Sequence, residues 1–275
     1  MADYLMRDDA PFSAEEWARV DELVVSTARN LLVGRRFISL TGPLGAGTEV
    51  VPIDTISVTP ACLHNEAGCN CASGECDVIE VSTRRFVPVP MIHKDFRLEW
   101  RHVAAGRQGG MPLELGPAAA AAAACARAED QLIFQDLLNA EGSHSVELGD
   151  WDEPGAAFAA VVGAIETLVA NGSFGPFAVV LSPALYAKTQ RVSRGMGRLE
   201  SKLIDDVAKG GMHRSPVLTG NQGMVVAQGA HNLDIAVAQD LVTAYLGPEG
   251  LDHMFRVMES LVLRIKRPGA IAVFK

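Results

Sequence analysis

Four cysteines lie within fifteen residues of one another in the segment CLHNEAGCNCASGECDV, residues 62–78. They are Cys62, Cys69, Cys71 and Cys76, and His64 stands beside the first of them. Thiolates and imidazoles are ligands that zinc and other soft metals prefer, and two neighbouring thiols can also form a disulfide. The segment is therefore the first candidate in this chain for metal binding or redox chemistry.

The spacing of these cysteines is Cys-x6-Cys-x-Cys-x4-Cys. Structural zinc sites usually pair cysteines about two to four residues apart, and only the pair Cys71 and Cys76 fits that pattern. A Cys-x-Cys unit can still clasp a soft metal. The spacing leaves three interpretations open, which are a metal site, a disulfide or redox-responsive pair, and inert thiols. The fifth cysteine, Cys125, lies in an alanine-rich segment and is expected to pack there.

No familiar catalytic motif accompanies the thiols. The sequence has no Gly-x-Ser-x-Gly, His-Glu-x-x-His, Walker or dinucleotide-binding pattern. Its seven histidines are scattered, and none stands four residues from another. We therefore expect a protein that is not an enzyme and requires no cofactor, with a metal at the cysteines as the one possible exception.

Composition narrows the class of protein further. The 275 residues carry a formal net charge of −9 and 48% apolar residues, which is ordinary for a globular protein and unlike a basic nucleic-acid binder. No uninterrupted run of about 18 apolar residues exists, because Glu166 breaks the nearest one. The first residues lack the basic-then-apolar pattern of a leader. We expect a cytoplasmic protein that binds neither nucleic acid nor membrane.

The first predicted element is an amphipathic helix. Ser13 and Glu16 form a capping-box pair at its start, and Gly34 is placed to end it. Apolar residues then recur at spacings of three and four, which predicts one apolar stripe. The stripe comprises Trp17, Val20, Val24, Ala28 and Leu31.

A long extended segment follows from residue 48 to residue 96. It is rich in β-branched residues and in prolines, which are typical of exposed strand edges, and the cysteines interrupt it like the tip of a hairpin. A limb of this length cannot bury both of its faces alone, and unpaired strand edges favour association. We therefore expect the limb to pair with another subunit.

The remainder alternates helices and strands. An alanine-rich helix is predicted from Pro117 to Gly142, and its small side chains allow other backbones to approach closely. A compact portion with helical and buried-strand patterns comes next, and the chain from Ser215 onward is rich in strands, with Pro268-Gly269 as a turn. The predicted class is α+β.

This order of elements, together with several segments, resembles the encapsulins, which are shell proteins with the HK97-like fold of tailed-phage capsids. The resemblance implies a peripheral domain (1–47, 97–150 and 232–275), an extended loop (48–96) and an axial domain (151–231). The segments that carry the likeness are APFSAEEWARVDE, LVVSTARNLLVGRRFISLTGPLG, RAEDQLIFQDLLNAEG, GPFAVVLSPALY, VAKGGMHRSPVL, VAQDLVTAYLG and IAVFK.

The resemblance implies that the chain is a homo-oligomeric shell subunit. Copies would close into an icosahedral nanocompartment around a cargo enzyme, such as a ferritin-like protein or a peroxidase, held by its C-terminal targeting peptide. The cargo-binding positions would be Val20, Val24, Leu31, Arg35, Phe37, Asp240 and Leu241. The pore for ions and small molecules would be lined by Ser193, Arg194, Gly195, Met196 and Gly197.

Two other functions are compatible with the same residues. One is a prophage or viral major capsid protein, since that fold is shared. The other is a metal-dependent or redox protein centred on the cysteines. The cysteine segment departs from the encapsulin pattern, which has a shorter turn there, so we interpret it as a decoration of the extended loop. Our hypothesis for it is a crosslink or metal clip between adjacent subunits.

Overall fold

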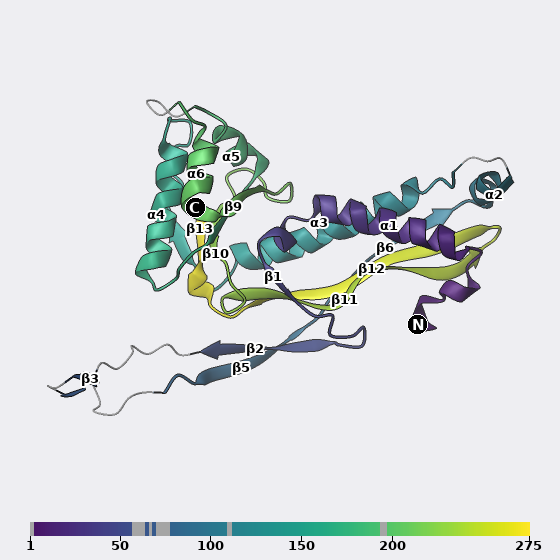
Figure 1. The fold of residues 1–275 in the computed structure, drawn as a ribbon, viewed down its shortest axis with the longest axis horizontal. Helices are drawn as coiled ribbons and strands as arrows, with labels where there is room; N and C mark the ends of the chain where they lie inside the picture. The colour runs from purple at the N-terminus through teal and green to yellow at the C-terminus, as the bar shows by residue number, and fades with distance from the viewer. Residues whose placement is uncertain (1–2, 57–63, 66–67, 70–77, 109–111, 193–196) are drawn as a thin grey trace.

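The computed structural model describes residues 3–56, 64–65, 68–69, 78–108, 112–192 and 197–275. Figure 1 shows three parts: two long helices lying along one sheet, an α/β lobe at one end, and a hairpin that projects away from both. Cys62, Cys71 and Cys76 lie outside the described residues, as do Ser193, Arg194, Gly195 and Met196.

The sheet beneath the two long helices has four strands in the order β1-β11-β12-β6. β11 (Leu233–Glu249) and β12 (Asp252–Ile265) form an antiparallel hairpin, β6 (Met91–Leu98) pairs antiparallel with β12, and β1 (Ser39–Thr41) pairs parallel with β11. Alternate residues of β12 point to opposite faces, and Phe255, Val257, Leu261 and Leu263 are buried on one of them.

Two helices cover the apolar face of this sheet (Figure 1). They are α1 (Ala14–Leu31) and α3 (Gly116–Leu138). The predicted capping box of α1 is confirmed, since Glu16 N–H donates to Ser13 Oγ and Ser13 N–H donates to the Glu16 carboxylate. The helix ends earlier than predicted, at Leu31, and Gly34 instead begins the short 3-10 helix η3 (Gly34–Arg36).

The alanines of α3 let α1 and the sheet approach closely. Ala118, Ala121 and Ala122 are buried in one cluster with Val20 and Val24 of α1. Cys125 lies one turn further along and is buried as predicted; its thiol donates to Val257 O at 3.6 Å, and burial raises the pKa of that thiol to about 12.

Replacing Ala122 with leucine is expected to destabilise the subunit by about 1–3 kcal/mol, because the larger side chain overpacks the contact between α1 and α3. Ala124 lies on the exposed side of the same helix, and its replacement with leucine should change stability by less than about 0.5 kcal/mol. Melting temperatures of the purified particles measure both effects. Equal melting of the two variants would contradict the close packing described here.

The lobe contains a five-stranded sheet in the order β7-β13-β10-β8-β9. Its helices are α4 (Ala156–Ala170), α5 (Pro183–Lys188) and α6 (Glu200–Ala208). Its strands are β7 (His144–Val146), β8 (Phe177–Leu181), β9 (Lys209–Arg214), β10 (Gly223–Ala227) and β13 (Ile271–Phe274). β7 and β13 thus hydrogen-bond into the sheet of the segment 151–231, although both lie in ranges that we assigned to the peripheral domain. The three-part division itself stays a prediction.

The projecting hairpin pairs β2 (Val50–Ile56) with β5 (Val81–Pro88). Its base rests on the body, where Val51 is buried against Ala236 and Val262. Further out, the described backbone contains the two-residue strands β3 (His64–Asn65) and β4 (Gly68–Cys69), in which His64 pairs with Cys69. Short helices complete the chain: η1 (Asp3–Leu5), η2 (Arg7–Asp9), α2 (Trp100–Gln108) and η4 (Pro268–Ala270).

Candidate functional site

A pocket of about 320 Å³ opens between the end of α1 and the middle of β11. Its apolar lining comes from α1, from the residues that follow it and from β11, and arginines and one aspartate add charge. The lining residues are Val25, Ala28, Arg29, Leu32, Arg35, Arg36, Leu40, Asp240 and Leu241. Apolar walls with a few charged groups are typical of a ligand site.

Irregularities in two elements create this pocket. The register of β11 against β12 shifts between Val237 and Gln239 and again between Gln239 and Val242, so the chain bulges there and presents Asp240 outward. On the other side, Gly34 lies against α3, and a Cβ at this position would meet Ile133 Cδ1 at 3.0 Å. Glycine therefore permits the close approach that brings η3, and with it Arg35, over the sheet.

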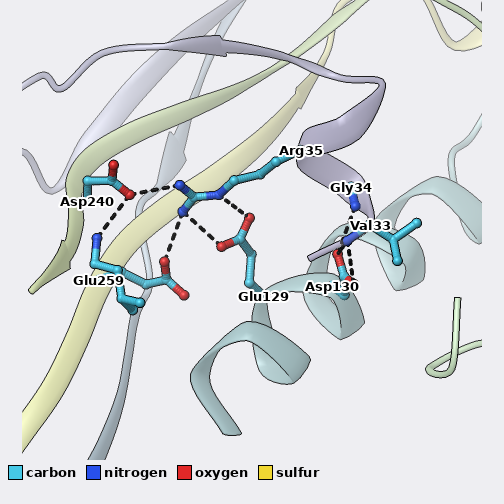
Figure 2. A network of polar contacts seen from close by, with 8 residues as sticks. Val33, Gly34, Arg35, Glu129, Asp130, Asp240 and Glu259 are labelled. Atoms are coloured by element: carbon cyan, nitrogen blue, oxygen red, sulfur yellow. Dashed lines mark hydrogen bonds and ion pairs between the residues drawn. The ribbon is translucent and has the colours of Figure 1, made fainter. Parts of the chain in front are cut away.

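Arg35 is the centre of a network of ion pairs (Figure 2). Its guanidinium donates to Glu129 at 2.7 and 2.8 Å, to Glu259 at 2.9 Å and to Asp240 at 2.7 Å. Glu129 and Glu259 are almost fully buried, whereas the Asp240 side chain is 63% exposed. One cation thus joins η3 to α3, β12 and the rim of the pocket.

The three carboxylates shift the acid–base equilibria in this network. Burial lowers the pKa of the Arg35 guanidinium, but the surrounding carboxylates outweigh burial and hold that pKa above its ordinary value. Burial and the nearby charge of Glu129 raise the pKa of Glu259 to about 9, although Arg35 opposes the shift. Burial also acts to raise the pKa of Asp240, but the hydrogen bond from Arg35 keeps that pKa below its usual range.

Asp130 anchors the backbone beside Arg35 (Figure 2). Its carboxylate accepts hydrogen bonds from Val33 N–H, at 2.9 and 3.1 Å, and from Gly34 N–H at 2.9 Å. Burial raises the pKa of Asp130 to about 6, while these amide donors act in the opposite direction. The carboxylate thus satisfies two buried backbone donors at the start of η3.

The structure brings three of the predicted cargo-binding residues together at the pocket. These are Arg35, Asp240 and Leu241. Leu31 is exposed but does not line the pocket. The cargo-binding role of all four stays a prediction.

The structure places the other three predicted cargo-binding residues in the core, and their cargo-binding role also stays a prediction. Val20 and Val24 are buried against the sheet and α3, on the inward side of α1. Phe37 is buried with its ring stacked on Phe134 and on His213. None of the three lines the pocket.

Several lining residues were missed by the sequence prediction. Val25 and Arg29 lie on α1 beside the apolar stripe, and Leu32 directly follows the helix, so the predicted stripe does not include them. The available signal was the arginine density of RNLLVGRR, which places three guanidinium groups within eight residues. Arg29 and Arg36 both line the pocket.

The predicted pore segment is described only in part. Gly197 has a φ of 63°, which suits glycine, and Arg198 pairs with Asp206 at 2.8 Å. An antiparallel bridge between Val192 and Leu199 closes the base of the loop. Pore lining by residues 193–197 stays a prediction.

The metal prediction also stays open. Among the described residues, no three His, Cys, Asp or Glu side chains are arranged to hold a metal ion. Three of the four clustered cysteines lie outside those residues, and of Cys69 only the backbone is described.

Within the same part of the chain, no helix has the length and apolar character needed to cross a membrane.

Comparisons with known proteins agree with this architecture. The model of a family described as encapsulating protein for peroxidase matches residues 2–262. The chain is 43% identical over its whole length to the type 1 encapsulin shell protein EncA of Myxococcus xanthus, of which it covers 97%. Over 95% of its length it is 35% identical to a diheme-cytochrome-encapsulin shell fusion protein of Kuenenia stuttgartiensis, of which it covers 73%.

Solved structures share the fold. A virus-like particle from Pyrococcus furiosus matches with a TM-score of 0.80 and 23% identity, over 95% of this chain and all of the other. The capsid of the Myoviridae phage XM1 matches with a TM-score of 0.62 and 13% identity, over 86% of this chain and 88% of that one. The phage match shows a common HK97-like fold and no closer relation. The predicted fold and resemblance are confirmed, and the chain belongs to the encapsulin family of shell proteins.

Proposed function

We propose that this shell subunit captures an enzyme on the inner wall of a closed, icosahedral compartment, and that the pocket at the end of α1 holds a short peptide of that enzyme. The observation that carries the proposal is the pocket itself. It combines an apolar lining from Val25, Leu32 and Leu241 with charged groups at its rim. Such a surface fits an extended peptide with apolar anchor side chains.

The pocket volume of about 320 Å³ lies at the small end of the range for ligand sites, which suits a few side chains better than a folded domain. Charges of both signs surround the lining, because Arg29 and Arg36 stand near the exposed carboxylate of Asp240. Apolar anchors supply affinity, and charged groups at the rim fix the direction of the bound peptide.

The proposed cargo is an iron-oxidising ferritin-like protein or a peroxidase, in the cytoplasm. Support comes from the family description as an encapsulating protein for peroxidase, and from a ferritin-like-encapsulin shell fusion protein of Pyrococcus furiosus that is 28% identical over 72% of this chain. The subunit itself contributes containment and pores, and the enclosed enzyme performs the reaction.

Replacing Val25 with aspartate is expected to reduce the amount of cargo per shell at least tenfold, because a charged carboxylate removes an apolar anchor site. The measurement is mass spectrometry of the contents of natively purified particles, with electron microscopy to verify closed shells. Val169 is exposed on α4 away from the pocket, so Val169→Asp is the matched control and should keep both the shell and its cargo. Unchanged loading of closed Val25→Asp shells would rule out this pocket as the docking site.

A further inference from the structure

A buried cluster with an excess of acids lies directly beneath the pocket. One guanidinium, that of Arg35, contacts three carboxyl groups, and two of these groups belong to the buried residues Glu129 and Glu259. The third, Asp240, forms the rim of the pocket. If all three were ionised, the cluster would carry two uncompensated negative charges, mostly in a medium that solvates them poorly.

Glu259 is the group least able to be ionised. Its side chain is 1% exposed, and its Oε1 atom is buried with no hydrogen-bond partner among the described residues. A carboxylate there would have one unsolvated anionic oxygen, whereas a neutral carboxylic acid tolerates this environment better and can donate a hydrogen bond to Glu129. The geometry therefore favours a bound proton at Glu259.

In the part of the chain that the structure describes, no second cation lies within contact distance of Glu259. Arg35 of η3 is its one ion-pair partner among the described residues. α3 contributes Glu129 and the Cys125 thiol, and β11 contributes Asp240. On β6, the apolar Ile92 stands opposite Glu259, and the charges of Lys94 and Asp95 act on Cys125; Arg29 of α1 acts on Asp240.

We infer that Glu259 is a proton-operated latch on the pocket. When Glu259 is protonated, it accepts only a neutral hydrogen bond from Arg35, which also holds Asp240 at the rim; when Glu259 is ionised, it draws Arg35 inward and releases the rim. The inference rests on the proposed function for its effect on cargo. Arg35 reaches Asp240 through Nη1 and Glu259 through Nη2, so a charge change at Glu259 acts on the same planar group that holds the rim.

The direction of the pH effect follows from the raised pKa of Glu259. The pKa of Glu259 rises from an ordinary value of 4.5 to about 9, so the proton stays bound through neutral pH. Unfolding releases this proton, so the folded form loses stability as pH rises from about 4.5 toward about 9. The latch opens as pH rises through about 9.

The test compares wild-type shells with the variant Glu259→Gln, whose amide keeps a donor and an acceptor but cannot ionise. The probe is a fluorescently labelled peptide with the C-terminal sequence of the enzyme found in native particles. Wild-type affinity is expected to fall about tenfold between about pH 8 and about pH 10, and the affinity of Glu259→Gln is expected to stay flat. Glu249→Gln, at an exposed glutamate paired with Arg97, is the control and should follow the wild type.

A second measurement separates the latch from peptide docking. Hydrogen–deuterium exchange at residues 239–241 of empty shells should accelerate in the wild type relative to Glu259→Gln above about pH 9. A wild type that binds peptide equally at all pH values overturns the latch and leaves the docking proposal intact. If no peptide binds at any pH, the docking proposal is wrong. The ratio of exchange rates between wild type and Glu259→Gln then tests the latch by itself.

A third variant covers the case in which Glu259→Gln does not assemble. Glu129→Gln removes the charge that helps to keep Glu259 protonated, so the exchange transition should move to lower pH. If the exchange transition occurs at the same pH in Glu129→Gln as in the wild type, the inference is contradicted. It is also contradicted if the wild type shows no such transition.

Discussion

Replacing Arg35 with alanine is expected to destabilise the subunit by about 3–5 kcal/mol, because it leaves the buried carboxyl groups of Glu129 and Glu259 without their cation. Attraction to a partner of opposite charge offsets the desolvation free energy of a buried ion, so removing one partner leaves that free energy uncompensated. Particles of Arg35→Ala should therefore melt at much lower temperature than the wild type or fail to accumulate. The melting temperature of purified particles is the measurement.

A matched control distinguishes burial from charge alone. Arg256 forms a similar two-contact pair with Asp95, at 2.6 and 2.9 Å, but this pair lies on the exposed face of the sheet. Arg256→Ala should cost less than about 1 kcal/mol. Adding Glu129→Gln to Arg35→Ala should recover part of the loss, because the amide removes a buried negative charge that has lost its partner. If the two arginine variants have the same melting temperature, the buried network adds no more stability than an exposed ion pair.

Local sequence signals predicted much of the fold. The capping box of Ser13 and Glu16 and the spacing of Trp17, Val20, Val24 and Ala28 identify α1, because caps and periodicity depend on neighbours within a few turns. Strand β12 also has a local signal, because apolar and polar residues alternate over much of FRVMESLVLRIK. Helix α2 was not predicted, because Trp100 continues the apolar alternation of β6, although the strand ends at Leu98 and the helix begins at Trp100.

The candidate site was predicted only where the resemblance supplied it. Arg35 contacts Glu259, which is 224 positions away, so no window of sequence can reveal that contact. The apolar stripe of α1 led to Val20 and Val24, but the strongest stripe marks the side of a helix that packs into its own core. The pocket opens on the flank of that stripe, beside Val25 and Leu32.

The projecting hairpin has an outer face that its own subunit does not cover. Val50, Ile56 and Phe86 are exposed, with Phe86 at 66%. Pro52 stands opposite Phe86 in the register, which extends the apolar surface across both strands. Within the described chain, the base of the hairpin contacts the body through Val51 and Val87 on the other face. In a shell protein, the uncovered face is available to a neighbouring copy.

Phe86→Asp is therefore expected to prevent closed shells from forming. Burying a phenylalanine stabilises a contact by roughly 1.5–3 kcal/mol, and burying an aspartate there without a partner adds a penalty of its own. The loss recurs at every copy, so a moderate penalty per contact multiplies across the particle. Electron microscopy should show unassembled protein that circular dichroism finds folded, whereas Phe86→Leu should still assemble. Intact Phe86→Asp shells would mean that this face stays in solvent, and that the subunits are joined through other surfaces.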